Sequence, residues 1–159
     1  MALIRGSSEL FLDSRFRGND RYDMPDYIKI YVAASVVVKQ DGKYLLVQEK
    51  KPSAYGLWNL PAGRVEEGQT IEDTAVREAK EESGYDVELI RHLDIFQGSD
   101  DGTSTCAHAF EAKIIGGELR VPEDMLDVKW FTYEEILKMK EKFRGLWQFK
   151  AIDIVEKRK

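Results

Sequence analysis

The sequence is poor in the residues that build disulfide frameworks, histidine metal sites and membrane spans. It has 1 cysteine and 2 histidines among 159 residues. The lone Cys106 cannot form an internal disulfide, so a reducing compartment is expected. No apolar run reaches the length that crosses a bilayer, and the first residues lack a compact apolar segment followed by a cleavage site. We therefore expect a cytoplasmic protein without a membrane partner.

The chain also lacks the surplus of basic residues that nucleic-acid binding requires. Its formal net charge is −5 and its pI is about 5.2. An acidic protein does not track a phosphate backbone, so no nucleic-acid partner is expected and RNA decapping is disfavoured. It can still bind a small phosphorylated molecule if a metal ion or a local basic cluster makes the contact. The length suits one globular domain.

The first 25 residues differ from the rest, because they mix Arg, Asp, Ser and Gly with little periodicity. We expect an N-terminal extension over residues 1–25 that packs loosely, followed by one domain over residues 26–159. The alternative is a real extension that packs against the domain. Met24 is a reasonable start for the folded unit, and "SRFRGND" resembles peptide translated from bacterial intergenic repeats.

The remaining patterns predict an α/β domain whose mixed β-sheet lies between helices. Runs of β-branched and aromatic residues predict strands at 27–39, 44–50, 86–96, 105–115 and 125–131, with loops at 51–64 and 97–104. Helices are predicted after Thr70, over 132–143 and over 146–157. Thr70 and Asp73 form the expected start of the first helix, and Gly84 its left-handed end. Apolar residues of the last helix recur at the spacing Leu146, Phe149, Ile152 and Val155.

The first predicted helix carries three glutamates on one face. Glu78, Glu81 and Glu82 stand at i, i+3 and i+4, and like charges four apart destabilise a helix by about 0.2–0.5 kcal/mol. One interpretation is a solvated face diluted by Lys80 and Arg77. The other is a site for a hard cation such as Mg²⁺, which prefers oxygen ligands and binds through one or two carboxylates and substrate phosphates. Arg77 can pair with Glu81 or fix a neighbouring carboxylate.

The stretch from Gly63 to Gly84 resembles the Nudix box. Its Gly, Arg-Glu, Glu-Glu and Gly letters all match, and "GLWNLPAG" and "VKWFTYEEI" resemble flanking parts of the family over roughly residues 26–145. Gln69 departs from the pattern, which has Glu there, and this removes a carboxylate that often contributes to a second or third metal. Tyr85 stands where an aliphatic residue is usual, and Ala62 replaces the first glycine of a pair. "PAG" occurs in branches that include ADP-sugar pyrophosphatases and 8-oxo-dGDP phosphatases.

The resemblance implies the Nudix fold and a Mg²⁺-dependent hydrolysis, with Mn²⁺ as the alternative ion. Nudix enzymes hydrolyse a nucleoside diphosphate linked to another moiety, so a nucleotide-like pyrophosphate, such as an oxidised nucleotide, is the expected substrate. The implied metal site comprises Gly63, Glu78, Glu81 and Glu82, with Arg77, Glu78 and Glu81 as catalytic residues. Glu78 is the base within the box, and the candidates outside it are Glu111, Glu118 and Glu123. Because Gln69 departs from the pattern, the alternative function is that of a catalytically weak nucleotide-binding or sensor module. The oligomeric state is expected to be a monomer or a homodimer.

Substrate contacts are predicted close to the box in the chain and at the start of the last helix. Lys50, Lys51 and Arg64 flank the box, where each either holds phosphate or is ordinary surface. Trp147 either stacks on a nucleobase or packs in the core of its helix. Trp58 and Trp130 are expected to pack, His92 and His108 to be structural, and Cys106 to be a buried strand residue.

Overall fold

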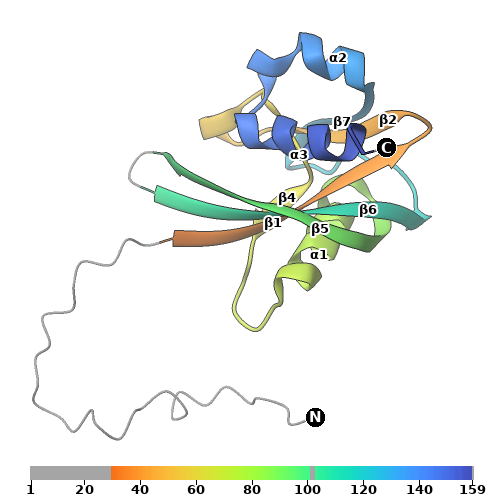
Figure 1. The fold of residues 1–159 in the computed structure, drawn as a ribbon. Helices are drawn as coiled ribbons and strands as arrows, with labels where there is room; N and C mark the ends of the chain where they lie inside the picture. Colours follow the sequence, from red (N-terminus) through yellow and green to blue (C-terminus); the bar gives the residue numbers. More distant parts are fainter. Residues whose placement is uncertain (1–29, 101–102, 159) are drawn as a thin grey trace, which may run out of the picture.

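The computed structural model describes residues 30–100 and 103–158 (Figure 1). Its strands are β1 Ile30–Gln40, β2 Lys43–Glu49, β3 Trp58–Asn59, β4 Ala62–Arg64, β5 Tyr85–Asp100, β6 Thr103–Gly117 and β7 Met125–Thr132. Its helices are α1 Ile71–Ser83, α2 Tyr133–Lys138 and α3 Leu146–Glu156, with 3-10 turns at Pro52–Ala54 and Lys140–Lys142. The predicted extension over residues 1–25 lies outside the described residues. No helix in the described part is long and apolar enough to cross a membrane.

Strand β1 lies in the middle of the sheet and makes it mixed. It pairs in parallel with β6, from Ile30 opposite Ser104 to Val38 opposite Ala112, and antiparallel with β2 and β4. The main path runs β3-β2-β1-β6-β5, with β4 on β1 and β7 on β2. Parallel neighbours require a long crossover, and here it contains α1 and β5.

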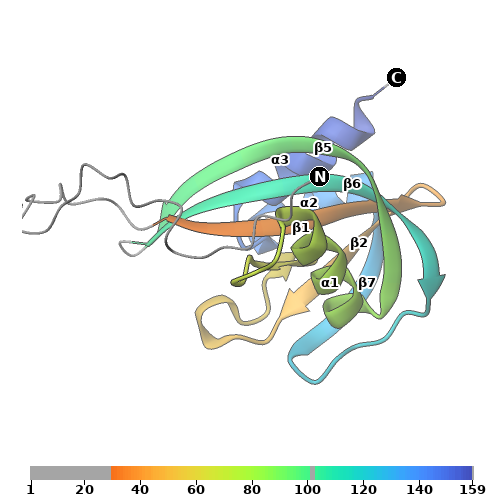
Figure 2. The ribbon, with the colours of Figure 1, turned by 90° about the horizontal axis from the view of Figure 1, so that it is seen from below.

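Helix α1 covers one face of the sheet, and α2 and α3 cover the other (Figures 1 and 2). Alternate side chains of β1 point to opposite faces, as the pleat requires. Val36 packs in one core cluster with Ala79 of α1, whereas Val37 packs in a second cluster with Ile152 of α3. The predicted α/β architecture, a mixed sheet between helices, is confirmed.

Helix α1 begins and ends where the sequence predicts. The Thr70 hydroxyl accepts a hydrogen bond from the Asp73 N–H at 3.0 Å, and Gly84 ends the helix at φ 84°. Ala75 and Ala79 are fully buried, so their small side chains let the helix lie close to the sheet. This placement fixes the polar side of α1 next to the loop that follows β4.

Two predicted loops are more regular than the sequence suggested. Residues 51–64 contain the 3-10 turn and the short strands β3 and β4. The predicted loop at 97–104 is also wrong, because β5 and β6 stay paired as far as Asp100 opposite Thr103. A ladder is held by backbone groups, so polar side chains do not stop it.

The helix predicted over 132–143 is shorter. Its capping box at Thr132 and Glu135 is confirmed, but α2 ends at Lys138. Phe143 is extended and forms a bridge with Trp58, whose carbonyl accepts from the Arg144 N–H at 2.9 Å. Pairing with β3 therefore replaces the end of the predicted helix.

The expected apolar face of α3 is wrong at its first residue. Leu146 is 67% exposed, although Ile152 and Val155 are buried. Gln148 takes the inward position, with 1% exposure, because its amide donates to Asn59 Oδ1 at 2.9 Å. A hydrogen bond between residues far apart in the chain thus determines which side chain of the first turn of α3 points inward. The spacing of apolar residues does not predict this.

Candidate active site

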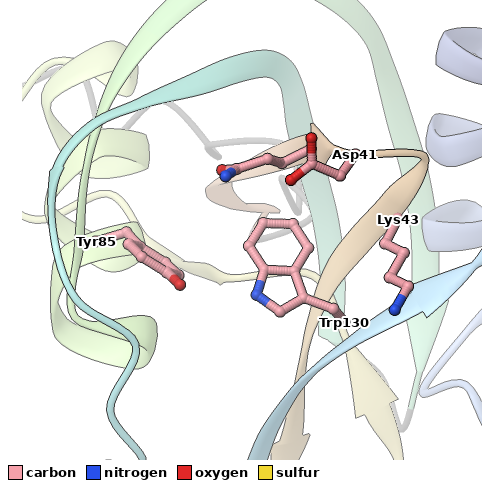
Figure 3. Close-up of a pocket in the computed structure, with 5 residues that line it drawn as sticks. Asp41, Lys43, Tyr85 and Trp130 are labelled. Atoms are coloured by element: carbon pink, nitrogen blue, oxygen red, sulfur yellow. The ribbon is translucent and has the colours of Figure 1, made fainter.

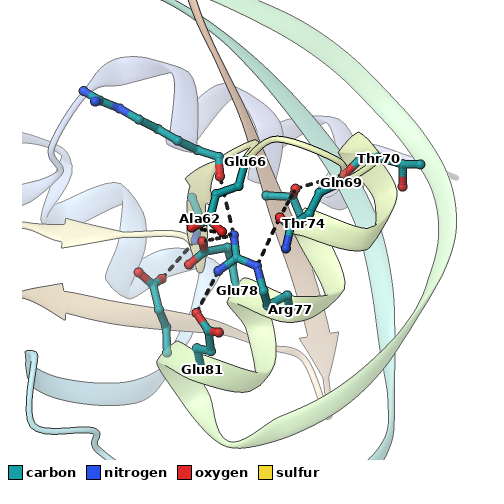
Figure 4. Close-up of polar contacts among 10 residues, drawn as sticks. Ala62, Glu66, Gln69, Thr70, Thr74, Arg77, Glu78 and Glu81 are labelled. Atoms are coloured by element: carbon teal, nitrogen blue, oxygen red, sulfur yellow. Dashed lines mark hydrogen bonds and ion pairs between the residues drawn. The ribbon is translucent and has the colours of Figure 1, made fainter. Parts of the chain in front are cut away.

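The polar face of α1 gathers its charged side chains around Arg77 (Figure 4). Arg77 Nη1 lies 2.8 Å from Glu81 Oε2, and Nη2 lies 2.8 Å from Glu78 Oε1. The i,i+4 spacing puts Arg77 and Glu81 on one face. Both contacts proposed for Arg77 from sequence therefore occur together, on two carboxylates that the family resemblance assigns to metal.

Gly63 of β4 leaves the space that the Glu78 carboxylate occupies. A Cβ atom at position 63 would lie 1.9 Å from Glu78 Oε1, which no ordinary contact allows. The pairing of Gly63 with Ala34 holds β4 at this distance from α1. Glycine is needed here for the close approach of strand and helix, and not for its backbone angles.

Glu82 is the buried member of the acidic face, with 5% exposure. Its Oε2 accepts a hydrogen bond from the Ala62 N–H at 3.0 Å. Burial raises the pKa of Glu82 to about 8, against the lowering effect of the Ala62 hydrogen bond, and the charges of Glu78 and Glu49 add to the rise. Burial also raises the pKa of Glu78, although Arg77 opposes this. Carboxyl groups perturbed together in this way favour a bound cation.

The donor set of this region fits a hard cation in its chemistry. Glu78, Glu81 and Glu82 offer carboxylate oxygens, which Mg²⁺ prefers. Within residues 30–100 and 103–158, no three His, Cys, Asp or Glu residues are arranged so that they could hold a metal ion. Arg77 engages two of the carboxylates and the Ala62 N–H engages the third. A cation must therefore compete with Arg77 for its ligands.

Gln69, the residue that departs from the Nudix box, faces Arg77. Its Oε1 accepts a hydrogen bond from Arg77 Nε at 3.3 Å and lies 3.1 Å from the Thr74 hydroxyl (Figure 4). The sequence suggested only a missing metal-facing carboxylate. In the structure, position 69 instead contacts the arginine that holds Glu78 and Glu81.

The basic residues near the box point in different directions. Lys50 Nζ donates to the Glu123 carbonyl at 2.7 Å, and the Arg64 guanidinium lies 4.0 Å from the Tyr31 ring centre. Lys51 Nζ lies 3.8 Å from Glu49 Oε2, and its charge has a small lowering effect on the pKa of both Glu78 and Glu82.

The three tryptophans differ in their surroundings. Trp58 is 8% exposed and packs edge-on against Phe131 at 4.7 Å, so it is a core residue as predicted. Trp147 is half-buried at the start of α3, and its ring lies 5.8 Å from that of Phe96 at an angle of 30°. The position of Trp147 is thus compatible with both roles proposed for it.

Trp130 lines a hollow that shares no residue with the acidic face of α1 (Figure 3). The hollow has a volume of about 320 Å³ and is lined by Gln40, Asp41, Lys43, Tyr85 and Trp130. The Tyr85 and Trp130 rings lie 6.0 Å apart. This hollow lies at the β1–β2 turn and does not contain the candidate catalytic groups.

Glu49 is a buried carboxylate that sequence reasoning missed. It is 1% exposed, and its Oε1 accepts from Asn59 Nδ2 at 2.8 Å and from Arg144 Nη1 at 3.0 Å. Its Oε2 is buried and has no hydrogen-bond partner, with Lys51 Nζ at 3.8 Å. Alternation along β2 gave no signal for it, because both faces of the strand are buried and its pairing with β7 shifts register between Gln48 and Glu49.

The candidate bases outside the box have other contacts. Glu111 Oε2 lies 2.7 Å from Arg91 Nε and 3.6 Å from Arg158 Nη1. The Glu118 carbonyl lies next to Gly84 at the far end of α1. Among the contacts of the described residues, none joins Glu111, Glu118 or Glu123 to the box carboxylates.

Cys106 and the two histidines lie on the long strands. Cys106 is only half-buried, so its prediction as a buried residue is wrong, because it lies near the end of β6 where less of the fold covers the strand. The His92 and His108 ring nitrogens lie 3.1 Å apart, and burial lowers the pKa of His108. One nitrogen of each imidazole ring is thus hydrogen-bonded to the other ring.

A comparison with known protein families decides the family. The NUDIX domain model matches residues 29–150. The chain belongs to the Nudix family. The matched span contains β4 and α1, and with them the stretch from Gly63 to Gly84 that resembles the Nudix box.

Curated relatives support the same assignment. An inferred nudix hydrolase of Caenorhabditis elegans is 36% identical over 128 residues, 77% of this chain but 34% of that protein. An ADP-ribose pyrophosphatase of Methanocaldococcus jannaschii is 30% identical, covering 71% of this chain and 68% of that protein. A human 8-oxo-dGDP phosphatase is 34% identical, covering 64% of this chain and 32% of that protein. The chain thus spans about a third of the length of two of these relatives.

A solved structure confirms the Nudix fold. A NUDIX hydrolase from Nitrosomonas europaea has a TM-score of 0.75 and 25% identity, covering 80% of this chain and 89% of that chain. The domain therefore has both the family signature and the fold of the Nudix hydrolases.

Proposed function

We propose that this Nudix domain uses Mg²⁺ to hydrolyse a nucleoside diphosphate-linked pyrophosphate, with water attacking phosphorus. The observation that carries the proposal is the joining of Glu78 and Glu81 by Arg77 beside the buried Glu82. A solvated face would leave its carboxylates exposed to water, whereas burial raises the pKa of Glu78 and Glu82 here. Such a locally unfavourable arrangement favours a functional site.

The residues of the chain have separate roles in this proposal. Glu78, Glu81 and Glu82, once released from Arg77 and the Ala62 N–H, would hold Mg²⁺, which would supply a Lewis acid and an activated water. Glu78 accepts the proton of the attacking water, because burial makes its carboxylate more basic. Arg77 orients Glu78 and Glu81 through its two Nη contacts. Lys51, whose charge acts on Glu78 and Glu82, neutralises part of the charge of the phosphates.

A purine nucleotide is the preferred substrate class, and an oxidised nucleotide its first candidate. The names of the human and archaeal relatives refer to 8-oxo-dGDP and to ADP-ribose. Trp147, half-buried and next to Phe96, offers a ring on which a base can stack. Gly63, Arg64 and Lys50 stay candidates for metal and phosphate contact, and Mn²⁺ stays the alternative ion. A cytoplasmic location, and a monomer or homodimer, stay predictions.

The test is a phosphate-release panel with and without Mg²⁺. It includes oxidised and normal nucleoside di- and triphosphates, ADP-ribose, NADH and dinucleoside polyphosphates. We expect metal-dependent release from at least one nucleoside diphosphate derivative. Nucleotide binding without any turnover across the panel would instead support the sensor module that Gln69 keeps open.

A further inference from the structure

We infer that Gln69 sets how strongly Arg77 holds Glu78 and Glu81, and that it thereby sets the divalent-cation affinity of the site. Gln69 is a positioning residue in this account, because it acts through Arg77. The inference rests on the proposed function, since it takes Glu78 and Glu81 as cation ligands.

The geometry ties Gln69 to one edge of the guanidinium. Gln69 Oε1 lies 3.3 Å from Arg77 Nε, while the opposite edge of the group contacts the two glutamates at 2.8 Å each (Figure 4). The backbone N–H of Gln69 donates to the Glu66 carbonyl at 3.1 Å, which anchors the residue before α1. The amide therefore orients Arg77 from the side away from the acidic face.

The hydrogen bonding of Gln69 is limited by Thr74. The Thr74 hydroxyl lies 3.1 Å from Gln69 Oε1 and 2.9 Å from the Thr70 carbonyl. A hydroxyl has one proton, so the two acceptors share it. Arg77 Nε, in contrast, donates its hydrogen to Gln69 Oε1 and does not divide it with a second acceptor among the described contacts. The Gln69 amide is therefore a specific partner of the arginine.

The uncharged side chain of Gln69 affects how the positive charge of Arg77 is shared among its partners. Glu78 and Glu81 carry the nearest negative charges, and Glu66 Oε1 is farther away, at 3.9 Å. A carboxylate at position 69 would draw the guanidinium toward its Nε edge and share its charge. With Gln69, most of the pull of Arg77 falls on the two carboxylates that a cation needs. Arg77 therefore lowers the affinity of the site for a divalent cation.

The experiment measures Mn²⁺ binding to the full chain by titration calorimetry and electron paramagnetic resonance, without substrate. We expect Gln69→Glu to tighten binding on the order of three- to fivefold, the scale of one partly exposed ion pair. The charge-matched control combines Glu67→Gln with Gln69→Glu, which removes an exposed carboxylate elsewhere in the same loop and leaves the net charge unchanged. It should keep the tightening, and its loss would mean that added charge alone was responsible and would overturn the inference.

A second variant tests the same contact from the opposite direction. Gln69→Met removes the acceptor without adding charge, so Arg77 should hold Glu78 and Glu81 more closely and Mn²⁺ should bind more weakly. It also keeps the inference falsifiable if Gln69→Glu does not fold. Equal Mn²⁺ affinity in the wild-type chain and a folded Gln69→Met would refute the role of Gln69, even if Gln69→Glu binds more tightly, because a carboxylate at position 69 can also ligate the cation directly. Absence of Mn²⁺ binding in the folded wild-type chain would instead refute the proposed metal site itself.

Discussion

Two arginine–glutamate clusters of this domain share their chemistry and differ in their architecture. Arg77 contacts Glu78 and Glu81 from the same helix, and the Glu81 side chain is 56% exposed. Arg144 contacts Glu49 across 95 positions of the chain, and the Glu49 side chain is 1% exposed. The first cluster needs no backbone movement to exchange partners. The second joins β2 to the segment before α3.

The difference in burial between the two clusters indicates which carboxylates can bind a cation. An exposed ion pair contributes about 0–1 kcal/mol, so a cation can displace Arg77 from Glu81 at little cost. A buried charge that loses its partner is strongly destabilising. Glu49 therefore has a structural role through Oε1, whereas the Arg77 cluster can rearrange for function.

The largest expected effect is that of Glu82→Gln on catalysis. The amide keeps the size of the side chain and an oxygen that can accept from the Ala62 N–H, but it removes the charge. We expect kcat/KM to fall on the order of 10²-fold or more, the cost of removing a major charge-stabilising group. Steady-state kinetics over a Mg²⁺ series check this. Full activity at low Mg²⁺ would refute the metal assignment of the acidic face.

The second prediction concerns the stability of the protein in EDTA as pH rises. The Glu82 carboxyl has an ordinary pKa of 4.5 when unfolded and a pKa of about 8 in the fold. A raised folded-state pKa favours the fold while the group is protonated, so this stability is complete below pH 4.5 and is lost as the pH passes about 8. We expect wild type to lose roughly 5–10 °C of Tm relative to Glu82→Gln over this range.

Thermal melts of both proteins at several pH values in EDTA isolate this effect, because all other titrating groups are shared. The two Tm values should agree at pH 4 and diverge by pH 8. Added Mg²⁺ should restore the wild-type Tm and leave that of Glu82→Gln nearly unchanged. Parallel curves in EDTA would show that Glu82 is no harder to ionise in the fold than in the unfolded chain.

The sequence predicted the Arg77 cluster well and the Glu49 cluster not at all. Spacing on a helix is a local property, so the sequence alone places Glu81 on the same face as Glu78 and within reach of Arg77. The caps of α1 at Thr70 and Gly84 are local in the same sense.

The rest depends on contacts between distant residues. Gln148 replaces Leu146 as the inward residue of α3 because Asn59, 89 positions away, accepts its amide proton. The neighbouring Lys50 and Lys51 likewise have different partners, the Glu123 carbonyl for Lys50 and Glu49 Oε2, at 3.8 Å, for Lys51. No periodicity encodes such pairs, and composition does not either.

The third prediction compares the two arginines directly. Arg144→Met leaves the buried Glu49 carboxylate with the Asn59 hydrogen bond and Lys51 Nζ at 3.8 Å, and should destabilise the domain by about 1–3 kcal/mol. Arg77→Met should cost less than Arg144→Met, since its partner Glu81 is 56% exposed and can turn toward water. Urea unfolding with EDTA measures both. Equal losses would contradict the distinction between a structural and an exchangeable cluster.

The smallest expected effect is that of Trp147→Ala, at the start of α3. If Trp147 stacks on the base, it stabilises ground and transition states alike, so KM should rise about tenfold while kcat changes little. Leu146→Ala is the matched control, because Leu146 is 67% exposed on the same turn and should change neither constant. A Trp147→Ala chain that unfolds would favour the core role suggested by the contact with Phe96. An unchanged KM in a folded variant would remove Trp147 from the site and leave the base to be held elsewhere on the α3 face.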